Sequence, residues 1–224
     1  MQKILTATAV LFLFLCACSA GITAGAEAKL KVFVSIPPQS GFVKAIAGEH
    51  AEISVMVQPE KSPASYEPSP RQMVNLAKSD IYFAIGVPFE TAWLSKFADA
   101  NPEMRIVHTE TGIERKPIHR HHGHHKTHHS AEGIKDPHIW LSPPLVMQQA
   151  RNILSGLKAV DPANADDYEQ NYQAFINRLV ELDIALMREF SEVSKPRFMV
   201  FHPSWGYFAD AYGLDQIAIE IEGK

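Results

Sequence analysis

Residues 161–192, DPANADDYEQNYQAFINRLVELDIALMREFSE, hold the longest helical pattern of this chain. Apolar residues recur in them at spacings of four, three, four, three and four: Tyr168, Tyr172, Phe175, Leu179, Leu182 and Leu186. Positions three or four apart share one face of a helix, so the spacing predicts one amphipathic helix with a charged opposite face. Asp161-Pro162 is typical of a helix start. At 1.5 Å per residue the helix would be about 45 Å long, and we expect it to cross from one domain to another. The alternative is a long helix lying on one sheet.

Before this helix, short β-branched and aromatic runs alternate with helical patterns. The expected strands are 30–36, 51–57, 80–86 and 105–108, and the expected helices are 39–48, a segment from Pro70, 88–98 and 143–157. Such alternation predicts an α/β fold with a parallel sheet, whose strand ends carry loops available for ligands.

The same pattern starts again after Lys195-Pro196, with an expected strand at 197–201, a helix at 205–212 and a strand at 216–220. The chain ends at Lys224, after one βαβ unit. We therefore expect a first lobe at 27–158, a linker helix at 159–194, and the start of a second lobe at 195–224 that is incomplete through a C-terminal truncation.

The composition limits the expected partners and the possible metal ligands. The chain has 224 residues, 46% of them hydrophobic, and a net charge of −4 without a Lys/Arg stripe, so nucleic acid is not an expected partner. Both cysteines, Cys16 and Cys18, lie in the first eighteen residues. The remainder therefore has no disulfide framework and no thiolate metal site, and any metal must use His, Asp or Glu.

The N-terminus predicts export. Residues 4–17 are apolar apart from two threonines, a length that fits a signal peptide and falls short of the roughly 20 residues of a membrane span. Two cleavage sites compete within the predicted signal segment 1–26. Leu15–Cys18 resembles a lipoprotein box in which Cys18 would be lipidated, whereas Thr23–Ala26 offers the small residues that ordinary signal peptidase prefers.

Residues 119–129, HRHHGHHKTHH, hold seven of the eleven histidines of the chain: His119, His121, His122, His124, His125, His128 and His129. Neutral imidazole is a common ligand of borderline transition metals, so this tract indicates zinc, nickel or copper. The alternative is a polar loop whose composition has no purpose.

Two further motifs each place one histidine beside a proline and close to a tryptophan. These are DPHIWLSP at 136–143, with His138, and FHPSWGYF at 201–208, with His202. Taken alone, each histidine suits a capping or hydrogen-bonding role. Together they suit an ordered metal site, because zinc needs three or four N or O ligands that separate loops usually supply.

These motifs, together with VFVSIPP, YEPSPRQM and the long helix, resemble the cluster A-I solute-binding proteins of bacterial zinc and manganese ABC transporters. The histidine tract before DPHIWLSP resembles the zinc branch in particular. The resemblance covers essentially all of the mature chain and implies two Rossmann-like α/β lobes joined by one linker helix, with the metal between them. It implies a protein at the periplasm or the outer face of the membrane that captures Zn²⁺, or as second candidate Mn²⁺, as transported ligand. It also implies delivery to an ABC permease, without catalysis or a catalytic cofactor, and membrane contact only through a lipid anchor.

Position by position, the resemblance makes His138 the metal ligand of the first lobe and His202 that of the second. The family usually has a further His where this chain has Ala64, in PASYEP at 63–68. Glu67, Gln39, water or a histidine of the tract could replace it, and Glu67 is the only charged candidate beside the gap. The acidic fourth ligand that the family carries near its C-terminus has no counterpart before Lys224.

The resemblance also implies that the tract is a flexible accessory loop, here 117–135, that captures zinc weakly over the cleft. Two alternatives remain open at this stage. One is a stand-alone zinc buffer or a nonfunctional remnant in which only the tract still acts. The other is a zinc-dependent hydrolase, against which the chain has no HExxH pairing and no motif that places a general base.

Overall fold

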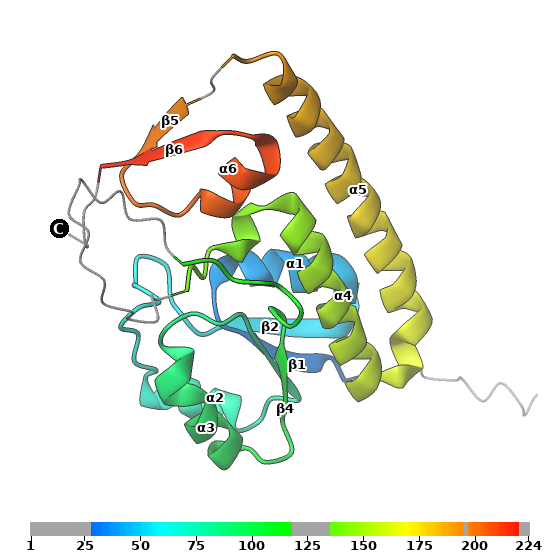
Figure 1. The fold of residues 1–224 in the computed structure, drawn as a ribbon. Coiled ribbons are helices and arrows are strands. Elements are labelled where there is room, and N and C mark those ends of the chain that lie inside the picture. Colours follow the sequence, from blue (N-terminus) through cyan, green and yellow to red (C-terminus); the bar gives the residue numbers. More distant parts are fainter. Residues whose placement is uncertain (1–27, 118–134, 195–196, 220–224) are drawn as a thin grey trace, which may run out of the picture.

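The computed structural model describes residues 28–117, 135–194 and 197–219 (Figure 1). The predicted signal segment with Cys18 and the seven-histidine tract lie outside the described residues. The elements in order are β1 (Leu30–Val34), α1 (Pro37–Ala47), η1 (Gly48–His50), β2 (Ala51–Val55), α2 (Pro70–Leu76), β3 (Ile81–Ala84), α3 (Glu90–Ala100), β4 (Arg105–His108), η2 (Ile139–Leu141), α4 (Pro143–Val160), η3 (Pro162–Asn164), α5 (Ala165–Ser191), β5 (Arg197–Val200), α6 (Gly206–Tyr212) and β6 (Asp215–Ala218).

The first sheet is parallel throughout, in the order β2-β1-β3-β4. Successive side chains of a strand point to opposite faces, and both faces are buried here. Val32 and Val34 of β1 pack on one side with residues of α1, α4 and α5, whereas Phe33 packs on the other. Helices α2 and α3 supply Leu76 and Phe97 to that second side (Figure 1). The sheet is thus the middle of three layers.

Helix α1 begins two residues earlier than the sequence indicated. Pro37 and Pro38 occupy its first turn, where a missing N–H costs nothing and a fixed φ suits the helix. Gln39 is fully buried and closes the preceding turn, because its Oε1 accepts hydrogen bonds from the backbone N–H of Ser35 and of Ile36. A pair of prolines that looked like the end of a strand is therefore also the start of a helix.

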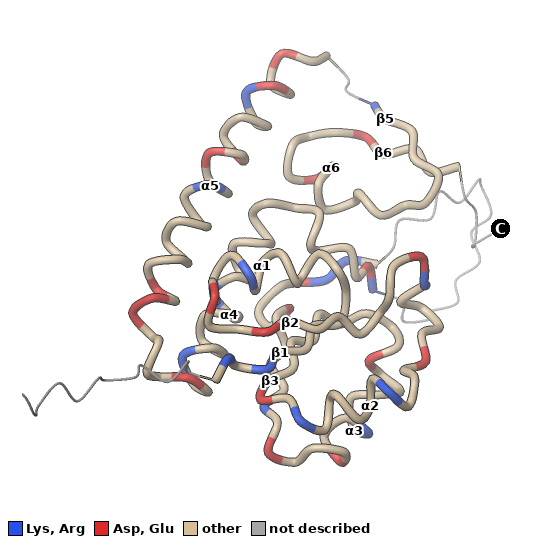
Figure 2. Tube along the Cα trace, turned by 180° about the vertical axis from the view of Figure 1, so that it is seen from behind, with Lys and Arg blue, Asp and Glu red and all other residues tan. Residues whose placement is uncertain are grey.

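Helix α5 has 27 residues, about 40 Å at 1.5 Å per residue. Its first half packs on the first lobe, where Tyr168 is fully buried with α1 and α4. Its second half reaches α6, where Tyr212 donates a hydrogen bond to Asp183 (2.7 Å) and Phe208 lies against Phe190 (ring centroids 6.0 Å apart). Charged residues follow its length (Figure 2). The helix therefore contacts both lobes.

The second lobe consists, among the described residues, of the parallel pair β5-β6 and α6, which lies between this pair and the first lobe (Figure 1). The predicted fold class is confirmed: a mixed α/β molecule with parallel sheets and one long helix. In the parts of the chain that the structure describes, no helix combines the length and the apolar character that a membrane crossing requires.

Candidate metal centre

His138 immediately precedes η2, in the segment of the first lobe between the histidine tract and α4. Asp136 organises this segment: its Oδ1 accepts hydrogen bonds from the backbone N–H of His138 (2.9 Å) and from ring atom Nδ1 of the same residue (2.6 Å). An Asp bonding to the backbone two residues ahead is a common turn device. The side chains of Asp136 and His138 are 7% and 14% exposed, so the ring is held in place and remains accessible.

His202 comes from the second lobe, two residues after β5 ends. Its ring centroid lies 5.2 Å from that of His138, with the ring planes at 73°. Two imidazoles that bind one tetrahedral zinc ion at about 2.0–2.1 Å place their ring centres about 5 Å apart. Trp140 also lies against His138, with ring centroids 5.1 Å apart. The fold thus brings together two histidines that are 64 residues apart in the chain.

Tyr207 of α6 joins the two lobes beside this pair. Its hydroxyl donates to the backbone carbonyl of Asp136 (3.0 Å) and accepts from the backbone N–H of Lys116 (3.0 Å). The ordinary pKa of a tyrosine hydroxyl already lies well above neutral pH, and burial raises the pKa of Tyr207 further, so the phenol is a donor at neutral pH. Lys116 also pairs with Asp210 of α6 (2.5 Å). The second lobe is therefore attached to the segment that carries His138.

The described residues on either side of the histidine tract meet at the same place. Pro117 and Lys135 form an antiparallel bridge, and the N–H of Asp136 donates to the carbonyl of Lys116 (2.8 Å). Both flanks of the tract therefore meet beside Asp136, the residue that contacts the ring of His138, although the tract itself falls outside the described residues.

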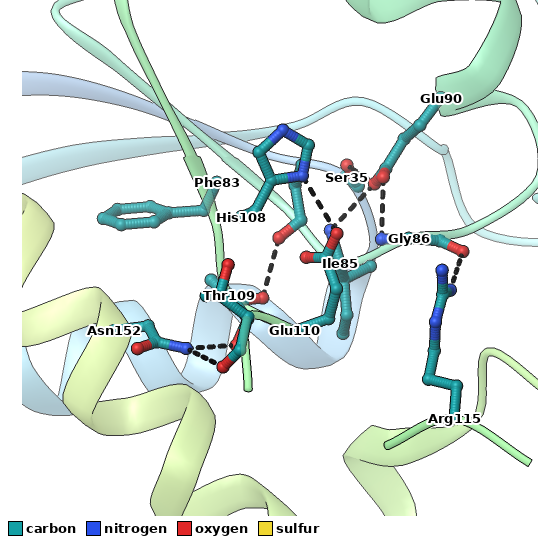
Figure 3. A network of polar contacts seen from close by, with 12 residues as sticks. Ser35, Phe83, Ile85, Gly86, Glu90, His108, Thr109, Glu110, Arg115 and Asn152 are labelled. Atoms are coloured by element: carbon teal, nitrogen blue, oxygen red, sulfur yellow. Dashed lines mark hydrogen bonds and ion pairs between the residues drawn. The ribbon is translucent and has the colours of Figure 1, made fainter. Parts of the chain in front are cut away.

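A buried polar network ties the carboxyl ends of β1 and β3 together (Figure 3). The carboxylate of Glu90 accepts from Ser35 Oγ (2.5 Å), from the backbone N–H of Ile85 (3.0 Å) and from that of Gly86 (2.7 Å). Burial raises the pKa of Glu90 above its usual value, although these hydrogen bonds oppose the rise. Glu90 belongs to the scaffold, because its acceptors are directed at the strand ends.

Gly86 in this network has a φ of +82°, a conformation that glycine adopts without strain. A Cβ there would also force the guanidinium of Arg115 to shift, and this group donates to the Gly86 carbonyl (2.6 Å; Figure 3). The loop after β3 is thereby fixed at the edge of the sheet where ligands of open α/β folds usually bind.

The other candidate ligands, Glu67 and Gln39, differ in their surroundings. Glu67 is exposed in the loop before α2, and Ala64 is exposed in the same loop. The amide of Gln39 is engaged inside the fold, with Oε1 accepting from two backbone N–H groups and Nε2 directed at Thr109 Oγ1 and two carbonyls. No group of three or more His, Cys, Asp or Glu residues within 28–117, 135–194 and 197–219 is arranged to hold a metal ion.

Two residues of this centre were not singled out from the sequence. Asp136 stands in the DPH motif, and its position two residues before a histidine is a signal that could have identified it. Tyr207 had no comparable signal, because its partners, Lys116 and Asp136, precede it by 91 and 71 residues.

A family model described as "Zinc-uptake complex component A periplasmic" matches residues 32–224. The chain is 29% identical over 202 residues to the zinc-binding lipoprotein AdcA of Streptococcus pneumoniae (strain ATCC BAA-255 / R6), covering 87% of this chain and 39% of that protein. It is 27% identical over 198 residues to the high-affinity zinc uptake system protein ZnuA of Bacillus subtilis (strain 168), covering 85% of this chain and 61% of that protein.

Among solved structures, a crystal structure of ZnuA matches with a TM-score of 0.78 and 38% sequence identity, over 88% of this chain and 72% of that chain. The chain thus spans about two fifths of the length of the S. pneumoniae relative and about three fifths of the B. subtilis relative.

Proposed function

The chain belongs to the ZnuA family of periplasmic zinc-uptake components, and from this premise we propose that it captures Zn²⁺ outside the cytoplasm and delivers it to an ABC permease. The observation that carries the proposal is the pair His138 and His202, one from each lobe, with ring centroids 5.2 Å apart. Imidazole ligands favour zinc, and a carboxylate-rich set would favour Mn²⁺, which is the second candidate. The metal is cargo, and the proposed role is binding and not catalysis.

The ligand set that we propose has His138 and His202 at its centre. The remaining positions would be filled by water, by a histidine of the tract or by Glu67. Gln39 is a poor candidate, because leaving the fold would cost its buried hydrogen bonds to two backbone N–H groups. Glu67 is exposed and carries no such cost.

We further propose the division into a signal segment at 1–26, a first lobe at 27–158, a linker helix at 159–194 and a second lobe from 195. Export through the signal segment, with or without a lipid anchor at Cys18, agrees with relatives that are named as periplasmic components or lipoproteins. The permease would then be met at the membrane surface.

The test is zinc titration of the purified protein by calorimetry, with His138→Ala and His202→Ala as variants. Each variant should weaken the tight site by at least tenfold, because each removes one ligand. His50→Ala is the matched control. His50 lies at the amino end of β2 and pairs with Asp167 on the surface (2.8 Å). Tight binding that survives in both site variants would refute the proposed centre.

The histidine tract supports a second candidate, a zinc buffer in which the tract alone acts. Deleting 119–129 should lower the number of weakly bound zinc ions and leave the tight site in place. If the deletion removes all zinc binding, the buffer is the correct function, and unchanged stoichiometry would exclude an accessory role of the tract.

A further inference from the structure

We propose that Asp136 is a positioning residue of the metal centre, which holds the ring of His138 with Nε2 available to the ion and is itself held by the second lobe. This inference rests on the proposed function and adds a residue that acts through His138. It is carried by the contacts of Asp136 on three sides: to the ring of His138, to the backbone, and to α6.

The contact to the ring selects one form of the imidazole. A carboxylate accepts hydrogen bonds, so the 2.6 Å contact places the proton of His138 on Nδ1. The lone pair then lies on Nε2, and a metal-binding histidine characteristically donates its other ring N–H to a carboxylate or carbonyl. Because the same oxygen also accepts from the backbone N–H of His138, moving the carboxylate away would break two hydrogen bonds at once.

The backbone of Asp136 is anchored at both of its polar groups. Its N–H donates to the carbonyl of Lys116, and its carbonyl accepts from the hydroxyl of Tyr207. The side chain is 7% exposed. A position fixed in this way leaves the carboxylate little freedom, which is what orientation of a ligand requires.

Helix α6 lies directly against the carboxylate. A Cβ at Gly206, the first residue of α6, would come within 3.3 Å of Asp136 Oδ2. Together with Tyr207 on the carbonyl, the start of α6 contacts Asp136 from the second lobe, the lobe that also supplies His202. Docking of α6 therefore places His202 and, through Asp136, orients His138.

The experiment compares Asp136→Ala, which removes the acceptor, with Asp136→Asn, which keeps an oxygen that can accept from Nδ1. Zinc affinity is measured by competition with a chromophoric chelator, and the melting temperature of the metal-free protein is measured for each variant. Loss of such an outer contact typically weakens metal binding by about 10- to 100-fold. We expect that loss for Asp136→Ala and recovery of most of the affinity for Asp136→Asn.

Two further measurements separate positioning from general structural damage. In the His138→Ala background, Asp136→Ala should cause no additional loss of affinity, since its effect acts through that ring. In the metal-free wild type, long-range ¹H–¹⁵N NMR should show His138 with its proton on Nδ1, a measurement that does not depend on any variant folding.

The inference is overturned if Asp136→Ala binds zinc as tightly as the wild type, if it causes an equal loss without the His138 ring, or if the proton resides on Nε2. A wild type that does not bind zinc would instead overturn the proposed function together with the inference. Loss in His138→Ala combined with full affinity in Asp136→Ala would leave the proposed function intact and refute only the role of Asp136.

Discussion

The two lobes are built from the same alternation of strands and helices, but they bury their apolar side chains to different extents. In the first lobe, helices cover both faces of a four-stranded sheet, and Tyr82, Phe83 and Phe97 are fully buried. In the second lobe, Met199 and Phe201 are 67% and 69% exposed. An open apolar hollow of about 730 Å³ lies there, lined by Phe190, Val193, Arg197, Phe198, Val200, Trp205, Phe208 and Leu214.

The difference shows that a βαβ pattern determines local structure more directly than it determines burial. A sheet face is removed from water only when another layer packs on it. The ring contacts of Phe208 and Tyr212 with Phe190 of α5, and the polar contacts of Tyr207, connect α6 to the rest of the molecule. The first lobe therefore acts as the scaffold of the proposed metal centre, and the second lobe is positioned on it.

Two phenylalanines give the largest expected contrast. Phe97→Ala in α3 should lower the free energy of unfolding by about 3–5 kcal/mol, because it leaves a cavity in a fully buried cluster. Phe201→Ala should change it by about 0.5 kcal/mol or less, because that ring is mostly in water. Urea unfolding followed by far-UV circular dichroism measures both. Equal losses would show that the second lobe is as well packed as the first.

A pair of helical glycines tests the close packing of the first lobe. A Cβ at Gly156 of α4 would lie 2.9 Å from Phe83 and 3.1 Å from Val107, whereas one at Gly41 of α1 would meet nothing within 4 Å. Gly156→Ala should destabilise the protein by about 1–3 kcal/mol through overpacking. Gly41→Ala should stabilise it by about 0.5–1 kcal/mol, because alanine favours the helix. Thermal unfolding compares the two, and stabilisation by both would indicate slack between α4 and the sheet.

The attachment of the second lobe is tested at Tyr212. Its hydroxyl donates to Asp183 of α5, and a hydrogen bond of this kind is worth about 1 kcal/mol. Tyr212→Phe should therefore raise the rate of amide exchange in α6 while exchange in β1 and β3 is unchanged. Tyr172→Phe is the control, since the described part of the chain gives its hydroxyl no hydrogen bond. A uniform increase across both lobes would contradict separate attachment.

The smallest effect is expected in the pH dependence of the free energy of unfolding, and it arises from Glu90 in the first lobe. The folded-state pKa of Glu90 is raised by burial above its ordinary value of 4.5, so the folded protein binds more protons than the unfolded chain between these two values. Stability from this group is present below pH 4.5 and decreases as the pH rises through the folded pKa. Relative to Glu90→Gln, the wild type should lose stability over that window in urea unfolding at a series of pH values. If the free energies of unfolding of the two proteins run parallel over this pH range, the raised pKa of Glu90 is refuted.

Most of the elements were predictable because they depend on local spacing. The strand at Arg105–His108 was predicted with its exact limits, and the long helix was predicted from its apolar stripe. The start of α1 was misplaced by two residues, since Pro37 and Pro38 suit both the end of a strand and the first turn of a helix. The metal-binding role of His138 and His202 remains a prediction of the family resemblance. The fold places the two rings close together.

Local patterns were enough to predict the α/β class, the long helix and the two motifs that carry the histidines, because periodicity and proline placement act over a few residues. The groups that surround those histidines depend instead on packing between distant parts of the chain. Asp136 is held by Lys116 and Tyr207, 20 residues before it and 71 after it in the chain. Contacts of that separation depend on how α6 docks on the first lobe, and the packing of two layers is not encoded in the spacing of either segment.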